Sequence, residues 1–327
     1  TDTAGASLKD GTLISEEGKA KVTAHGVLQI KKLSAKDSAT VEADHDVTLP
    51  EAEAGTLAIK SGGSVNAGTL TATTGNAEVT AKKDVTIDAL NAKEHAELTS
   101  GGDMVLTEAH ANTLTANAGG KLDMTKKLST AGKAELTSGN AMEVTDANVG
   151  SVTANAGTTL HVAKLISNGE ATLTSKDEAK LDDVTAGTLA AESTAGSVNA
   201  GTLTATTSDA KVKAKTDATI GTLKAEAGGA TIEATEGALG VTTLNAKSLT
   251  AKAGTTLSAE TLDVKEHAEL TSGNAMDITD ANVSSVTAKA GTTLHVKKLT
   301  STGEATLTSK DEAKLDDVTA GTLAAES

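Results

Sequence analysis

The sequence predicts an all-β protein, a single parallel right-handed β-helix (β-solenoid) of roughly 17 turns, with three short strands and about 18–20 residues in each turn. Three observations lead to this fold class. A short unit repeats along most of the chain, apolar and polar residues alternate within each unit, and the composition suits only a thin core. We therefore expect residues 1–327 to form one continuous β-helix.

The composition indicates an ordered structure built of narrow layers. The chain has no Phe, Tyr, Trp, Cys or Arg and a single proline, Pro50. Its apolar residues are mostly Ala, Val and Leu, whereas a compact domain of this size normally buries aromatic side chains. Disordered chains are poor in β-branched residues and rich in proline, which is the opposite of what this chain shows.

A long internal repeat pairs residues 134–193 with residues 268–327. The two copies differ at seven positions, of which we expect five to point outward, one to lie at a corner and only Val144/Ile278 to point inward. The other six are Glu143/Asp277, Gly150/Ser284, Asn155/Lys289, Ala163/Lys297, Ile166/Thr300 and Asn168/Thr302. A second match, GSVNAGTLTATT, begins at Gly63 and at Gly196.

The shorter unit has the pattern of three strands joined by corners. In KAELTSGNAMEVTDANVG every second residue within each strand is apolar, which is the period of a strand with one buried face. The predicted inward residues are Ala134, Leu136, Met142, Val144, Ala147 and Val149. Period two and abundant Thr and Gly exclude a helical repeat. One turn cannot bury its inner face, but stacked turns can.

The first strands of successive units predict how the core is filled. Their inward pairs are Ala96/Leu98, Leu114/Ala116, Ala134/Leu136, Val152/Ala154, Ala171/Leu173 and Leu189/Ala191. Large and small residues exchange places from one turn to the next. Each Leu should therefore stack on a small residue, which fills a narrow core without aromatic side chains.

Charge and hydropathy restrict the partners. The net charge of −15 argues against nucleic acid, because binding to phosphates needs clustered cations. No apolar run approaches the length of a membrane span, so we expect no insertion into a membrane. With no cysteine, disulfides and thiol chemistry are excluded. We expect no cofactor.

The polar residues suggest only weak metal sites, and we expect none to be occupied. The seven histidines should be solvated and spread along the chain: His25, His45, His95, His110, His161, His267 and His295. Asp44–His45–Asp46 is a weak metal pair whose side chains should diverge. The acidic runs at Lys176–Asp177–Glu178 with Asp182 and Asp183, and at Lys310–Asp311–Glu312 with Asp316 and Asp317, offer oxygen ligands for calcium, but we favour charged, solvated corners.

Two other functions are less favoured. A carbohydrate-active β-helix enzyme needs a carboxylate pair and normally a cleft lined with aromatic side chains, and this chain has no aromatic residue. We therefore expect no catalytic residues. An ice-binding threonine ladder would run along the outward columns of the first strands, but Glu97, Glu135, Lys211 and Lys213 interrupt these columns. Strand propensity explains the threonines better.

Phrases such as AGGKLDM, SGGDMVLTEAHANTLTANAGG and GNAEVTAKKDVTIDAL resemble the haemagglutinin-type repeats of filamentous haemagglutinin-like exoproteins. These are two-partner-secreted adhesins of Gram-negative bacteria. The resemblance covers nearly the whole chain and implies export to the extracellular space or cell surface, where the protein would form a stalk or fibre. The chain shows no recognisable secretion domain and no toxin-like module.

The two ends of the chain read as complementary parts of one turn. TLAAES at 188–193 continues into TAGSVNAGTLTATT, while the same TLAAES closes the sequence at 322–327, and TAGASLKDGTLISEE near the start resembles that continuation. The expected assembly residues are Ala4, Ala6, Leu8, Leu323 and Ala325. They predict a structural fibre or stalk subunit that polymerises head to tail with itself. The alternative is an excised stalk segment of a longer β-helical adhesin that binds an unknown surface receptor.

Overall fold

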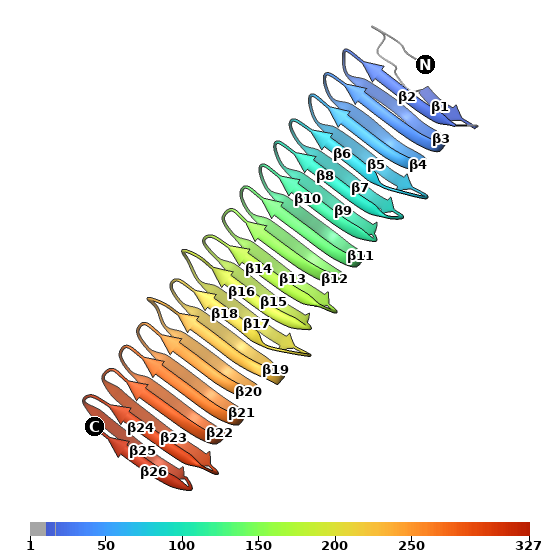
Figure 1. Ribbon diagram of the computed structural model, residues 1–327. Coiled ribbons are helices and arrows are strands. Elements are labelled where there is room, and N and C mark those ends of the chain that lie inside the picture. Colours follow the sequence, from blue (N-terminus) through green and yellow to red (C-terminus); the bar gives the residue numbers. More distant parts are fainter. Residues whose placement is uncertain (1–10, 17) are drawn as a thin grey trace. The chain divides into compact units, whose positions relative to one another are not determined.

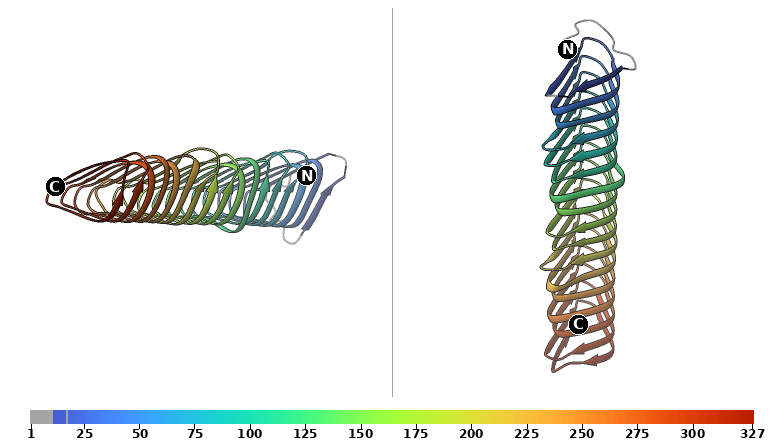
Figure 2. Two further views of the ribbon diagram at one scale, coloured as in Figure 1. Left: turned by 90° about the horizontal axis from the view of Figure 1, so that it is seen from below. Right: turned by 90° about the vertical axis from the view of Figure 1, so that its right-hand side faces the viewer.

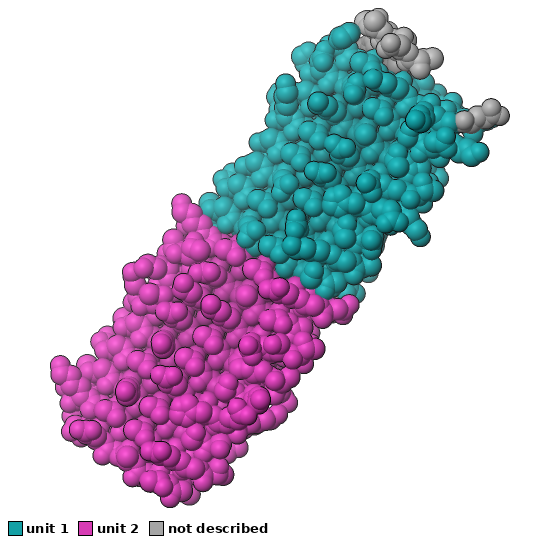
Figure 3. Space-filling model, in the orientation of Figure 1, with its two compact units in different colours: residues 1–158 teal, residues 159–327 magenta. Residues whose placement is uncertain are grey.

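The protein is an all-β solenoid of about 17 turns, as the sequence predicts. The computed structural model describes residues 11–16 and 18–327, and these residues form 26 strands and no helix. The chain divides into two compact units, residues 1–158 and 159–327, which are coloured separately in Figure 3. Each unit is described by itself below.

In the first unit the chain winds as a stack of parallel strands (Figure 1). The strands are β1 (Gly11–Ser15), β2 (Lys19–Ala24), β3 (Leu28–Ala43), β4 (Val47–Ser61), β5 (Val65–Ala72), β6 (Ala77–Ala81), β7 (Val85–Ala92), β8 (His95–Ser100), β9 (Met104–Ala111), β10 (Thr113–Ala118), β11 (Leu122–Ser138) and β12 (Met142–Ala156). Each strand pairs in parallel with the equivalent strand one turn later, for example β8 with β10 and β10 with β11.

The second unit repeats this arrangement (Figure 2). Its strands are β13 (Leu160–Ser167), β14 (Glu170–Ser175), β15 (Ala179–Ala186), β16 (Thr188–Ser193), β17 (Val198–Ala205), β18 (Ala210–Ala214), β19 (Ala218–Ala234), β20 (Leu239–Ala253), β21 (Leu257–Ser272), β22 (Met276–Ala290), β23 (Thr293–Ser301), β24 (Glu304–Ser309), β25 (Glu312–Thr319) and β26 (Thr322–Glu326).

The core is packed as the alternation of large and small residues predicts. Leu114 lies between Ala96 and Ala134 in the neighbouring turns. In the same strands Ala116 lies between Leu98 and Leu136, and all six side chains are buried. Every predicted inward residue of the unit at 133–150 is also buried. Of the seven positions that differ between the long repeats, only Val144/Ile278 is buried.

The second and third predicted strands of a turn are joined. Strand β9 runs without a break from Met104 to Ala111, and its pairing with β11 shifts register between Met124 and Lys127. Strand β11 carries one more residue than β9 in this interval, and the pairing resumes at Lys127 and Glu108. The second and third predicted strands of this turn therefore form one continuous strand.

Aspartates fix another corner by accepting a backbone hydrogen bond from the next turn. The Oδ1 atom of Asp84 accepts from the Asp103 N–H at 2.9 Å, and Asp103 Oδ1 accepts from the Lys121 N–H at 2.7 Å. The residue before each donor is a glycine for a steric reason. A Cβ at Gly102 would lie 2.2 Å from Asp84 Oδ1, and one at Gly120 would lie 2.1 Å from Asp103 Oδ1. Aspartate and glycine thus form a matched pair.

Buried serines close the strand ends beside these corners. Ser100 Oγ donates to the Gly102 carbonyl at 3.0 Å, and Ser193 Oγ donates to the Asp177 carbonyl at 2.7 Å. Ser175 and Ser309, which are equivalent positions of the long repeat, are buried with no hydrogen-bond partner for their Oγ atoms. Of the nine buried serines among the described residues, seven therefore have a hydrogen-bond partner for Oγ and these two do not.

Candidate functional site

The C-terminal turn of the second unit exposes residues that the fold buries elsewhere. Leu323 of β26 is 47% exposed, and Ala325 is exposed too. Their equivalents in the first copy of the long repeat, Leu189 and Ala191 of β16, are only 1% and 2% exposed. The side chains are identical, so the difference arises from what covers them. Leu323 and Ala325 are two of the predicted assembly residues.

The strand that precedes this turn shows the same contrast. Ala313, Leu315 and Val318 of β25 are half-buried, whereas their equivalents in β15 are fully buried. Strand β15 pairs with β13 on one side and β17 on the other. Among the described residues, β25 pairs only with β23 and β26 only with β24. The last turn therefore presents both uncovered core residues and a free strand edge.

The other predicted assembly residues, Ala4, Ala6 and Leu8, lie outside the described residues. Strand β1 lies within the N-terminal segment that the sequence analysis matched to TAGSVNAGTLTATT, and the structure adds one strand that the sequence interpretation did not include, β2. Within the described part of the chain these strands pair on one side only, with β3. A sequence signal for β2 exists: AKVTA at 20–24 is nearly identical to AKVKA at 210–214, and the latter strand covers β16.

The histidines do not gather into a site. All seven are exposed or half-buried, and five contact a polar group one turn away. His161 Nε2 lies 3.1 Å from Asp182 Oδ2, and the equivalent His295 Nε2 lies 3.2 Å from Asp316 Oδ2. The hydrogen bond to His295, followed by the nearby Lys314 charge, lowers the pKa of the Asp316 carboxyl.

The predicted weak metal ligands point to different partners. Asp44 Oδ2 lies 3.0 Å from His25 Nδ1, whereas Asp46 Oδ1 accepts from the Ser64 N–H at 2.8 Å. In the acidic run of the second unit, Glu178 Oε1 accepts from the Asn199 amide at 2.7 Å. No group of three or more histidine and acidic side chains in the described ranges is arranged to hold a metal ion.

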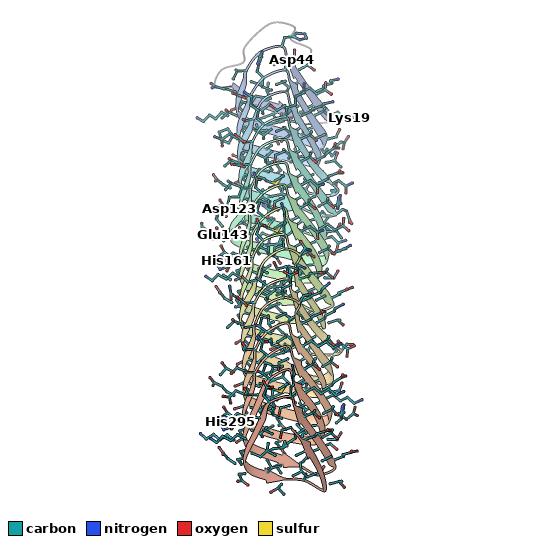
Figure 4. All side chains as sticks on the ribbon, turned by 90° about the vertical axis from the view of Figure 1, so that its left-hand side faces the viewer. Lys19, Asp44, Asp123, Glu143, His161 and His295 are labelled. Carbon is teal, nitrogen blue, oxygen red and sulfur yellow. The ribbon has the colours of Figure 1, made fainter. Side chains whose placement is uncertain are left out.

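Some charged side chains on the sides of the turns form ion pairs. Lys121 Nζ lies 3.0 Å from Asp123 Oδ2 and 3.5 Å from Glu143 Oε2, and these two acids project from the same side of the ribbon (Figure 4). The hydrogen bond to Asp123 raises the pKa of Lys121. Lys32 and Glu51, 2.6 Å apart on consecutive turns, form a similar pair, and its hydrogen bond raises the pKa of Lys32.

A shallow groove of about 700 Å³ lies at a corner of the first unit, beside β7, β9 and β11. Its ionisable lining side chains are Lys93, Glu94 and His110, and Glu94 is the one carboxylate among them. A glycosidase needs a pair of carboxylates flanking the scissile bond, and this groove does not supply a pair.

In comparisons with known proteins, no family model, no curated protein and no solved structure matches this chain. The resemblance to haemagglutinin-type repeats therefore stays a prediction. Within the described residues there is no helix long and apolar enough to cross a membrane.

Proposed function

We propose that the protein is structural, a subunit of an extracellular or cell-surface β-helical fibre or stalk that polymerises head to tail by completing a shared turn. The observation that carries this proposal is the contrast between β26 and β16. The same Leu and Ala side chains are exposed in one turn and buried in the other. A chain that covers β26 as β18 covers β16 would bury them.

The physical gain has two parts. Fully burying a leucine side chain contributes about 1.5–3 kcal/mol, and Leu323 is almost half exposed. The free edges of β25 and β26 also present N–H and C=O groups that a further parallel strand can pair. A contact between one end of a copy and the other end of the next is heterologous and need not close, so it generates extended assemblies.

The net charge of −15 is spread along the chain and need not prevent this contact. Some of the side charges are paired within each unit, as Lys32–Glu51 and Lys298–Asp280 illustrate. Of the two strands that would be covered, β26 carries one ionisable side chain, Glu326, and β25 carries four, Glu312, Lys314, Asp316 and Asp317. The location at a cell surface is supported by the resemblance to haemagglutinin-type repeats alone.

Light scattering over a range of protein concentrations, followed by electron microscopy, tests the proposal. We expect the mass to rise with concentration above that of a 32.4 kDa chain, and threads without a visible break between subunits. A mass that stays at one chain under all conditions would refute polymerisation. The rest of a longer β-helical chain would then be the partner to look for.

A further inference from the structure

We propose that Asn168 and Gly169, in the corner between β13 and β14, form a self-modifying site, at which the Asn168 amide is converted to aspartate or isoaspartate without an enzyme. The reaction uses the backbone nitrogen of Gly169 and water. It takes place within a single chain, so it is independent of the proposed fibre and of how copies of the chain assemble.

The sequence singles out this corner. The chain has 13 asparagines, and Asn168 is the only one followed by glycine. All the others are followed by Ala, Val or Thr. A Cβ on the following residue crowds its backbone nitrogen and restricts the backbone, and glycine has no Cβ. Asparagine is one of the thermolabile residues of proteins, and here the next residue leaves its side chain open to attack.

The Asn168 side chain is free to react. It is exposed and lies in a corner outside the strands. In the described part of the chain its amide group makes no hydrogen bond. Other asparagine side chains are held by the neighbouring turn. Asn199 Nδ2 donates to Glu178 Oε1 at 2.7 Å, and Asn282 Nδ2 donates to Asp263 Oδ1 at 3.3 Å.

The Gly169 nitrogen is less restrained than its counterpart in the second copy of the long repeat. There the Gly303 N–H donates to the Ser284 carbonyl at 2.7 Å. Within the described ranges the Gly169 N–H, which lies outside the strands, donates to no backbone carbonyl. The residue before Gly303 is Thr302, which has no amide to react. The reactive side chain and the unbonded nitrogen therefore occur together in the first copy.

The reaction balances with water as the only co-reactant. The Gly169 nitrogen forms a bond to Asn168 Cγ, and the bond between Cγ and Nδ2 breaks. The proton of the Gly169 nitrogen leaves with the amide group as ammonia, and a succinimide ring remains. Water then opens the ring. Attack on Cγ gives aspartate, whereas attack on the main-chain carbonyl carbon gives isoaspartate, in which the backbone runs through Cγ.

Both products change the corner, and isoaspartate changes it more. Its backbone has an additional atom between Ser167 and Glu170, and the hydrogen bond from Ser167 Oγ to the Glu170 carbonyl, 3.2 Å long, spans this stretch. The Gly169 carbonyl also accepts from the Gly187 N–H of the next turn at 2.8 Å. Aspartate keeps the normal backbone and adds a negative charge beside Glu170. We therefore expect the isoaspartate form to unfold at a lower urea concentration than the aspartate form.

Peptide mass spectrometry of the full-length chain during storage tests the proposal. The folded protein is kept at neutral pH and physiological temperature and then cut after lysine. This gives residues 165–176 as the reporter peptide and residues 299–310 as its counterpart from the second copy. We expect the reporter to exchange its amide NH2 for OH and to separate into two products on chromatography, while the counterpart stays unchanged.

Two variants and one internal comparison sharpen the test. Gly169→Ala should slow the conversion about tenfold, because a Cβ crowds the nitrogen and restricts the backbone. Asn168→Thr, which reproduces the sequence of the second copy, should abolish it without changing the circular dichroism spectrum. Asn140 is the matched internal control, since it is also an exposed corner asparagine but is followed by Ala141.

The chain unfolded in guanidinium chloride shows the reaction without the fold. Conversion at residue 168 in the folded protein, with Asn140 unchanged, would support the proposal. Conversion in the denaturant but not in the folded protein would overturn it, because the fold would then protect the corner. Conversion of Asn140 as fast as Asn168 would overturn it too, because glycine would then not be the determinant.

Discussion

Asp103 and Gly120 form a matched pair whose energetic coupling can be measured. Asp103 Oδ1 accepts a hydrogen bond from the Lys121 N–H at 2.7 Å, and a Cβ at Gly120 would lie 2.1 Å from the same oxygen. Asp103→Ala deletes the acceptor, whereas Gly120→Ala displaces it. Both substitutions therefore remove the same hydrogen bond, by different routes.

The expected magnitudes follow from this shared bond. A hydrogen bond to a charged acceptor contributes about 1.5–3 kcal/mol, and water can replace part of it because Lys121 is half-buried. We expect Asp103→Ala to lower the free energy of unfolding by about 1–2 kcal/mol, and Gly120→Ala by at least as much. The double variant should cost little more than Gly120→Ala alone, which gives a coupling of about 1 kcal/mol.

Gly119→Ala is the matched control. A Cβ there would lie 2.3 Å from the Gly101 carbonyl oxygen, a backbone atom that truncation of Asp103 cannot move. The effects of Gly119→Ala and Asp103→Ala should therefore add.

Urea unfolding followed by far-UV circular dichroism suits a chain without Trp or Tyr. Because solenoids can unfold in parts, exchange of the Lys121 amide hydrogen provides a local readout, and it should accelerate in both single variants. Additive costs for Asp103→Ala and Gly120→Ala would refute the shared-bond explanation.

Three further predictions concern single side chains. Leu136→Ala should lower the free energy of unfolding by about 2–5 kcal/mol in urea, because this core side chain is 1% exposed; a loss below about 1 kcal/mol would contradict the packing described. Ser193→Ala should cost about 1–2 kcal/mol by removing its hydrogen bond, while Ser175→Ala should cost nothing, since its Oγ has no partner; equal losses would count against this assignment. In an NMR titration the pKa of the Asp316 carboxyl should be lower in the native chain than in the His295→Ala variant. Because the folded pKa of this carboxyl lies below its unfolded pKa, the contact with His295 stabilises the fold at pH values above the unfolded pKa, and this stabilisation is lost as the pH falls through the folded pKa. An identical Asp316 pKa in both proteins would exclude the contact.

The sequence predicts the fold because the signal is repeated in every turn. The sequence itself shows that Leu and Ala exchange places between Ala96/Leu98 and Leu114/Ala116. Once one turn is stacked on the next, this exchange sets the register in which β8 and β10 pair. The period of two decides which side chains point inward, so the core residues were predicted correctly without any structure.

The polar contacts between turns could not be predicted in the same way. Asp103 and Lys121 are 18 residues apart, and His161 and Asp182 are 21 apart. Turn length varies by a few residues, so the partner of a polar side chain is fixed only once each corner is placed. Strand β2 was missed for a different reason. Its sequence is similar to that of β18, but the two segments lie far apart in the chain, at residues 20–24 and 210–214.

The proposed assembly would restore a contact between neighbouring turns that β26 lacks in the described part of the chain. In a solenoid, stability is approximately the sum of the stabilities of the turns and the contacts between neighbours. β16 has a neighbour on each side, whereas β26 has one in the described part of the chain. A strand that covered β26 as β18 covers β16 would regain one contact between neighbours. Association also costs about 4–15 kcal/mol in lost translational and rotational freedom. A contact of the internal kind between two chains should therefore form in a concentration-dependent way, and subunits should exchange as the protein is diluted.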